Sequence, residues 1–69
     1  MAITERWQSQ DGHWLVHVLW DDTTGRRYNV YYEQELWTPR PLTSMRALDG
    51  YLGRMARLDV GDLVKAPEL

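Results

Sequence analysis

The chain has 69 residues, no cysteine and a net charge of −2, which exclude a disulfide-stapled fold or a thiolate zinc site and disfavour a generic nucleic-acid binder. A chain this short is expected to form one domain, near the lower size limit for folding without staples. No signal-peptide pattern or membrane-spanning apolar run is visible, so we expect a cytoplasmic protein without a membrane segment. Four Trp and four Tyr, with no Phe, supply the large apolar area that a small core needs.

The first expected element is a strand over about residues 3–9. Asp11 and Gly12 follow it, a pair typical of two-residue turns in β-hairpins. This turn predicts two cross-strand pairs with a second strand, Trp7 with Val16 and Glu5 with Val18. The register places Trp7 on the face that the apolar residues of the second strand occupy.

The next two expected strands cover about residues 13–21 and 27–34, and apolar residues alternate along both of them. Gly25 suits the left-handed position of a three-residue loop, Thr23-Thr24-Gly25. The expected partners are Trp20 and Tyr28, Val18 and Val30, Val16 and Tyr32, and the oppositely charged Asp21 and Arg27. The two hairpins together predict one aromatic core face, built on Trp7, Trp14, Val16, Val18 and Trp20.

Residues 35–43 are expected to cross over the sheet in an extended form, because Pro39 and Pro41 cannot donate to a strand ladder. Trp37 would fold back to close one end of the core. The Pro-Arg-Pro triplet is also the pattern of a polyproline ligand, and a plain linker is the favoured interpretation.

A helix is expected over about residues 44–58, capped by Thr43 or Ser44. Its apolar stripe, which suits the aromatic face of the sheet, consists of Met45, Leu48, Leu52 and Met55. The tail, residues 60–69, either adds an edge strand or frays. The expected fold is therefore α+β: a three-stranded antiparallel β-meander followed by one C-terminal α-helix packed on one sheet face.

One helix covers only one face of such a sheet, and the other face carries the first candidate site. Leu15, His17, Leu19 and Tyr31 would lie there on adjacent strands. An apolar cluster of this kind is either tolerated surface or a contact site for a protein.

The second candidate site lies on the helix. Arg46, Gly50, Gly53 and Arg57 fall within about 60° of one another on a helical projection, opposite the apolar stripe, and Arg54 flanks them. Glycine in a helix interior costs about 1 kcal/mol relative to alanine, so two of them favour a groove for close approach. The alternative is that Gly50 or Gly53 ends a shorter helix as a C-terminal cap.

No cofactor, metal or catalytic site is expected. His13 and His17 are four residues apart, which on a strand spans about 13 Å and is too far for one ion. No nucleophile–base set, glycine-rich phosphate loop or calcium-loop spacing is present. We therefore expect that the protein is not an enzyme.

These features favour a small non-catalytic protein-binding module, a regulator or inhibitor that masks or recruits a protein partner, with a homodimer as one form of that contact. Chains of this size and character are common among phage and mobile-element accessory proteins. The alternative is a nucleic-acid-binding protein that uses the Arg-rich helix as a dimer, since residues 26–58 carry six Arg against three acidic residues.

Overall fold

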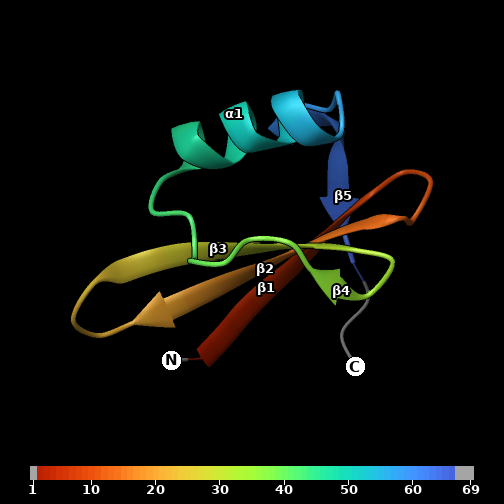
Figure 1. Ribbon diagram of the computed structural model, residues 1–69. Coiled ribbons are helices and arrows are strands. Elements are labelled where there is room, and N and C mark those ends of the chain that lie inside the picture. The colour runs from red at the N-terminus through yellow and green to blue at the C-terminus, as the bar shows by residue number, and fades with distance from the viewer. Residues whose placement is uncertain (1, 67–69) are drawn as a thin grey trace.

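The computed structural model describes residues 2–66, which form a five-stranded antiparallel sheet with one α-helix above it (Figure 1). The elements are β1 (Ala2–Ser9), β2 (Trp14–Asp21), β3 (Gly25–Tyr32), β4 (Glu35–Leu36), α1 (Met45–Met55), the 3-10 helix η1 (Val60–Asp62) and β5 (Leu63–Lys65). The strands are ordered β4-β3-β2-β1-β5. The expected α+β class is confirmed, but the three-stranded description is wrong, because a short strand adds to each edge.

The β1–β2 hairpin has the register that its turn predicts. Trp7 pairs with Val16 and Glu5 with Val18. Nearer the N-terminus the register shifts between Ile3 and Glu5, and Ile3 pairs with Leu19. A bulge of this kind moves the residues before it to the opposite face, so Ile3 lies on the side of the sheet away from Trp7.

The β2–β3 hairpin is paired two residues away from the expected register. Val16 faces Val30, Val18 faces Tyr28, and Asp21 faces Gly25. The turn closes one residue early because the Asp21 carboxylate accepts hydrogen bonds from two loop amides, at 2.8 and 3.2 Å. Gly25 has the positive φ that the sequence predicts (80°). A shift of two residues leaves each side chain on its expected face.

β4 exists because the chain turns back sharply after β3, where the sequence predicts an extended crossover. Glu33 and Gln34 form the turn, with φ angles of 50° and 69°, and Tyr32 pairs directly with Glu35. Two left-handed residues match the twist of a tight hairpin, but the usual residues there are Asn and Gly. The pair Glu-Gln therefore gave no recognisable turn signal.

The tail contributes the opposite edge strand, so for residues 63–65 the edge-strand alternative is the correct one. β5 pairs with the end of β1, Ser9 with Leu63 and Trp7 with Lys65. The tail prediction for residues 67–69 lies outside the described residues.

Helix α1 starts where the sequence predicts and ends three residues early. The Ser44 hydroxyl accepts a hydrogen bond from the Ala47 amide, which makes Ser44 the N-cap. At the other end, Arg57 has a φ of 56°, and the Leu58 amide donates to the Leu52 carbonyl across it (3.2 Å). Arginine thus occupies the left-handed position after the helix that usually holds glycine. Neither glycine of the helix is the cap.

Two single substitutions near the end of α1 are expected to stabilise the protein. Arg57→Gly should raise the free energy of unfolding by about 0.5–1 kcal/mol, because glycine adopts a positive φ without steric cost. Gly53→Ala should also raise the free energy of unfolding, by up to about 1 kcal/mol, because Gly53 lies inside the helix, where alanine is favoured over glycine. There is room for the added β-carbon, whose nearest neighbour would be the Leu58 carbonyl oxygen at 3.9 Å. Urea denaturation measures both changes, and a loss of stability in Arg57→Gly would contradict the assigned ending.

The core lies between α1 and the near face of the sheet. Its members include two fully buried valines, Val16 and Val30, and Leu52 of the helix. At one end Trp14 packs against Tyr32 and Trp37, with ring centroids 4.6 and 5.5 Å away. Trp37 thus folds back against that end as the sequence predicts, and 43% of it stays exposed.

At the other end of the sheet, the predicted core face extends further than the buried core does. Trp20 alternates onto this face, yet it is 48% exposed, and its indole N–H donates to Asp22. Its cross-strand partners are Ala2 and Arg26, which offer it little apolar surface. Trp20 is therefore not a core residue. Met45 and Met55, at the two ends of the helical stripe, are also about half exposed.

Candidate functional site

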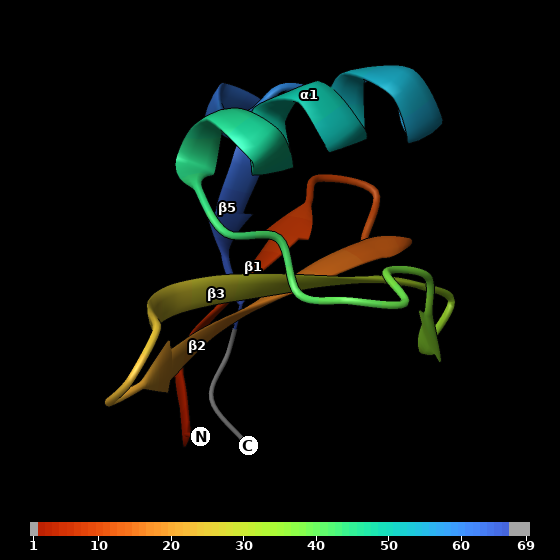
Figure 2. The same cartoon turned by 60° about the vertical axis from the view of Figure 1, so that its left-hand side comes forward.

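The side of the sheet away from α1 carries no described helix (Figure 2). Strand alternation and register define its members, which we call the open sheet face: Ile3, Arg6, Gln8, Leu15, His17, Leu19, Arg27, Asn29, Tyr31, Leu36 and Val64. The face combines apolar side chains with two arginines and a histidine.

One row of side chains crosses all five strands of the open sheet face. Direct cross-strand pairing joins its members in the order Val64, Gln8, Leu15, Tyr31 and Leu36. Leu15 and Tyr31 are half-buried at the centre, and the apolar residues at the two ends are 42% and 49% exposed. Side chains directly opposite each other in a sheet are close enough to touch, so the row forms a continuous ridge.

The structure brings together three of the four residues expected on this face as accessible side chains, Leu15, His17 and Tyr31. Leu19 is different, because only 6% of it is exposed. It lies between its direct partners Ile3 and Arg27, both large side chains. The prediction that Leu19 offers contact surface is therefore wrong, and its role is to pack the sheet.

His17 lies at the centre of the open sheet face. Its direct partners are Arg6 on β1 and Asn29 on β3, and its ring lies 4.5 Å from that of Tyr31, centroid to centroid. Partial burial, and then the positive charge of Arg6, lower the pKa of His17 below its usual value. Each of these causes disfavours the protonated imidazole in the folded state.

This shift gives an expected pH dependence. Because the pKa of His17 is lower in the folded chain than in the unfolded one, its contribution to stability is complete above about pH 6.5 and is lost as the pH falls toward the folded pKa. Wild type should therefore lose stability relative to His17→Gln between pH 7 and pH 5. Urea denaturation at several pH values measures the difference, and parallel profiles for the two proteins would contradict it.

The open sheet face carries two arginines, Arg6 and Arg27. Neither Arg6 nor Arg27 forms an ion pair within residues 2–66. Alternation places two acidic residues at the margins of this side: Glu33, which pairs with His13, and Asp21, whose carboxylate is turned toward the amides of Thr23 and Thr24. These backbone hydrogen bonds lower the pKa of Asp21 and hold it in the turn. The face therefore carries two arginines that form no ion pair with a carboxylate within residues 2–66.

The second candidate site is not one surface. Arg57 lies beyond the end of α1 in a left-handed conformation, so it leaves the helical face that Arg46, Gly50 and Gly53 share. A β-carbon at Gly50 would lie 3.4 Å from a guanidinium nitrogen of Arg54, because that side chain folds back over Gly50. The expected flat groove is thus partly filled by one of its own flanking arginines.

Three residues of the open sheet face were not assigned to it from the sequence. Ile3 reaches the face through the bulge after it, Leu36 through the Glu33–Gln34 turn, and Val64 through the undecided tail. The bulge has no sequence signal. For Val64, the short apolar run after Gly61 is a signal that would have been sufficient.

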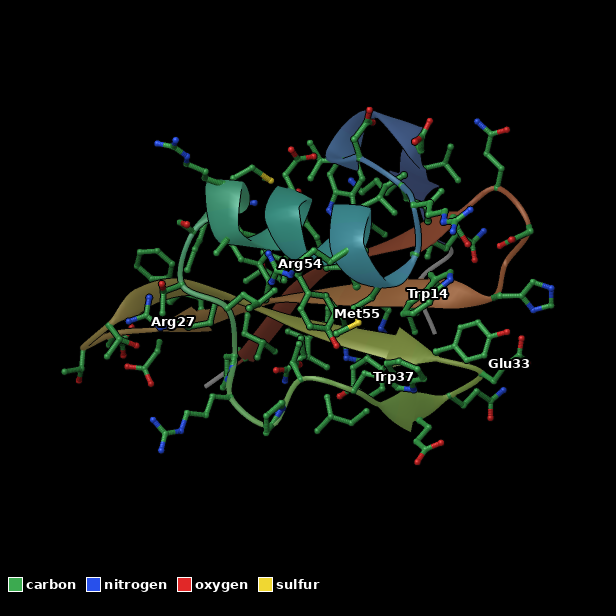
Figure 3. All side chains as sticks on the ribbon, turned by 45° about the horizontal axis from the view of Figure 1, so that its top comes forward. Trp14, Arg27, Glu33, Trp37, Arg54 and Met55 are labelled. Carbon is green, nitrogen blue, oxygen red and sulfur yellow. The ribbon has the colours of Figure 1, made fainter. Side chains whose placement is uncertain are left out.

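Neither histidine lies in a cluster that suggests a metal. His13 pairs with Glu33 at the far end of the sheet, where Figure 3 shows Glu33 on the same side as Trp14 and Trp37 and away from Arg27. Residues 2–66 contain no group of three or more His, Cys, Asp or Glu side chains placed to hold a metal ion. No helix in the same range combines the length and apolar character needed to cross a membrane.

No protein-family model, curated protein or solved structure matches this chain.

Proposed function

We propose that this protein is a small non-catalytic module that binds a protein partner through its open sheet face, and so acts as a regulator or inhibitor. The observation that carries the proposal is the exposure of three large apolar side chains, Ile3, Leu36 and Val64, on a face that also holds Arg6, His17 and Tyr31. Tyr and Arg are enriched at protein interfaces, and contiguous apolar surface is what such interfaces bury.

The charge of the face favours one kind of partner, a protein surface with apolar side chains surrounded by carboxylates. Arg6 and Arg27 would pair with those carboxylates, and the arginine side chain suits the planar geometry of such contacts. A second copy of this chain fits less well, because two open sheet faces would bring like charges together. A nucleic acid fits less well too, since the face carries only two arginines and phosphate binding needs more.

The test compares two side chains that are equally exposed on opposite sides of the molecule. Leu36 on the open sheet face and Met55 on α1 are both 49% exposed. The tagged chain is used to capture a partner from a lysate of its source organism, with nuclease-treated lysate in parallel. The captured protein is then purified and titrated against wild type, Leu36→Gln and Met55→Gln. We expect Leu36→Gln to weaken binding about tenfold and Met55→Gln to change it less than twofold.

Arg6→Gln should also weaken binding, and it should flatten the dependence of affinity on salt. The proposal is overturned if the two glutamine variants bind equally, if the captured material disappears after nuclease treatment, or if wild type captures nothing beyond what Leu36→Gln captures. Sedimentation that shows a wild-type dimer dissolved by Leu36→Gln would assign the face to a second copy instead.

A further inference from the structure

A cavity of about 230 Å³ lies between α1 and the sheet, on the opposite side of the sheet from the open sheet face. Eight side chains line it, contributed by six different elements: Trp7, Val16, Val18, Tyr28, Met45, Leu48, Val60 and Leu63. Of these, Met45 is exposed and Trp7 and Val60 are partly exposed, so the cavity opens to solvent between them.

The lining is almost entirely apolar. Two of its side chains carry a polar group, and one of these groups is already engaged, because the Trp7 indole N–H donates to Glu5 (3.1 Å). Glu5 also lies 3.6 Å from Arg26, whose guanidinium carbon is 5.8 Å from the centroid of the Tyr28 ring. The two aromatic walls are thus held in place by a pair of charged side chains outside the cavity.

Hydrogen bonds anchor the segments on either side of α1 that border the cavity. Before the helix, Leu42 and Tyr28 exchange two backbone hydrogen bonds, at 2.9 and 2.7 Å, which tie the entering chain to β3. After it, the Val60 amide donates to the Asp49 carboxylate (3.0 Å), which ties η1 to the helix. The space is therefore formed by anchored elements.

From this geometry we propose that the cavity binds a small uncharged apolar group, a single aromatic ring or a short alkyl chain. The size decides the class: a dry apolar cavity of about 150 Å³ accepts benzene, and drug-sized ligands occupy about 300 Å³ or more. A space of 230 Å³ with this lining accepts one ring and is too small for a partner's helix or strand. Charged groups are excluded, because no lining residue neutralises them.

The test uses benzene as the probe and compares two valine substitutions, one in the cavity lining and one on the opposite side of the sheet. Benzene titrated into the wild-type chain should shift the indole N–H resonance of Trp7 saturably and raise the melting temperature. Val60→Phe places a ring in the cavity, so it should raise the melting temperature without ligand and reduce the Trp7 shift at least fivefold. Val64→Phe adds the same ring on the open sheet face and should leave benzene binding within twofold of wild type.

Met45→Phe provides a second filling variant at the cavity mouth in case Val60→Phe does not fold. The proposal is overturned if Trp7 shows no saturable shift up to the aqueous solubility of benzene. It is also overturned if the shift persists undiminished in the filled variants, because benzene would then bind elsewhere. Neither outcome bears on the open sheet face, which lies on the other side of the sheet.

Discussion

Trp14→Ala is expected to destabilise the chain by about 3–5 kcal/mol, the usual cost of removing a large buried aromatic side chain. Trp14 is 8% exposed and lies where the helix end, β3 and Trp37 meet. Figure 3 shows Trp14, Trp37 and Met55 gathered at this end of the molecule. A core in a chain of this size supplies about 3–5 kcal/mol in total, so the variant should be largely unfolded without denaturant.

Trp20→Ala is the matched control, since Trp20 lies on the same strand and alternates onto the same face. At 48% exposure it should cost no more than about 1 kcal/mol. Far-UV circular dichroism during urea denaturation reports both variants without relying on tryptophan fluorescence. If the free energy of unfolding of Trp14→Ala lies within about 1 kcal/mol of the wild-type value, the aromatic end of the core is misassigned.

Leu19→Ala is the second large effect, with an expected cost of about 2–3 kcal/mol. The residue points away from α1, yet it is almost fully buried between Ile3 and Arg27. Removing it would leave a gap in the middle of the sheet that its partners on β1 and β3 cannot close without moving. Denaturation curves measure this loss.

Leu36→Ala is the comparison for Leu19→Ala, because it removes the same atoms from the same face. Leu36 is 49% exposed, and its replacement should change stability by about 0.5 kcal/mol or less. The two variants therefore separate packing from contact surface on one face. Equal losses would mean that the open sheet face is packed throughout and does not present Leu36 to a partner.

The features that could be predicted are those with a local chemical signal. Alternating apolar residues gave the three central strands, and Ser44 gave the start of α1 through its hydroxyl. Asp11 and Gly12 gave the register of the first hairpin correctly. The face assignment of β3 remained correct despite the shifted register, because the shift was an even number of residues.

The features that could not be predicted use residues against their usual preference. Glu33, Gln34 and Arg57 all adopt positive φ angles, where sequence patterns lead one to expect Asn or Gly. These three positions decide the presence of β4 and the end of α1. The candidate site depends on them as well, since the turn at Glu33 brings Leu36 to the open sheet face and the early helix end removes Arg57 from the helix groove.

The way the chain covers its own strand edges limits how any partner can approach. Beyond β4, the Trp37 amide donates to the Val30 carbonyl, the Thr38 hydroxyl accepts from the Val30 amide, and Leu42 bonds to Tyr28, so the outer edge of β3 is largely occupied. On the other side, β5 and the Ala66 amide occupy the edge of β1 from Arg6 to Ser9.

Along the three long strands, the stretch of edge that these described contacts leave is the start of β1, where the bulge after Ile3 interrupts a regular ladder. The outermost strands, β4 and β5, are only two and three residues long, and very short edge strands offer little ladder to a further strand. Exposed regular edges are templates for adding strands, and bulged or covered edges resist this. The sheet is thus protected against growth into ribbons with further copies. These edges therefore favour the binding mode proposed above, in which a partner would lie across the flat of the sheet and contact side chains more than backbone amides.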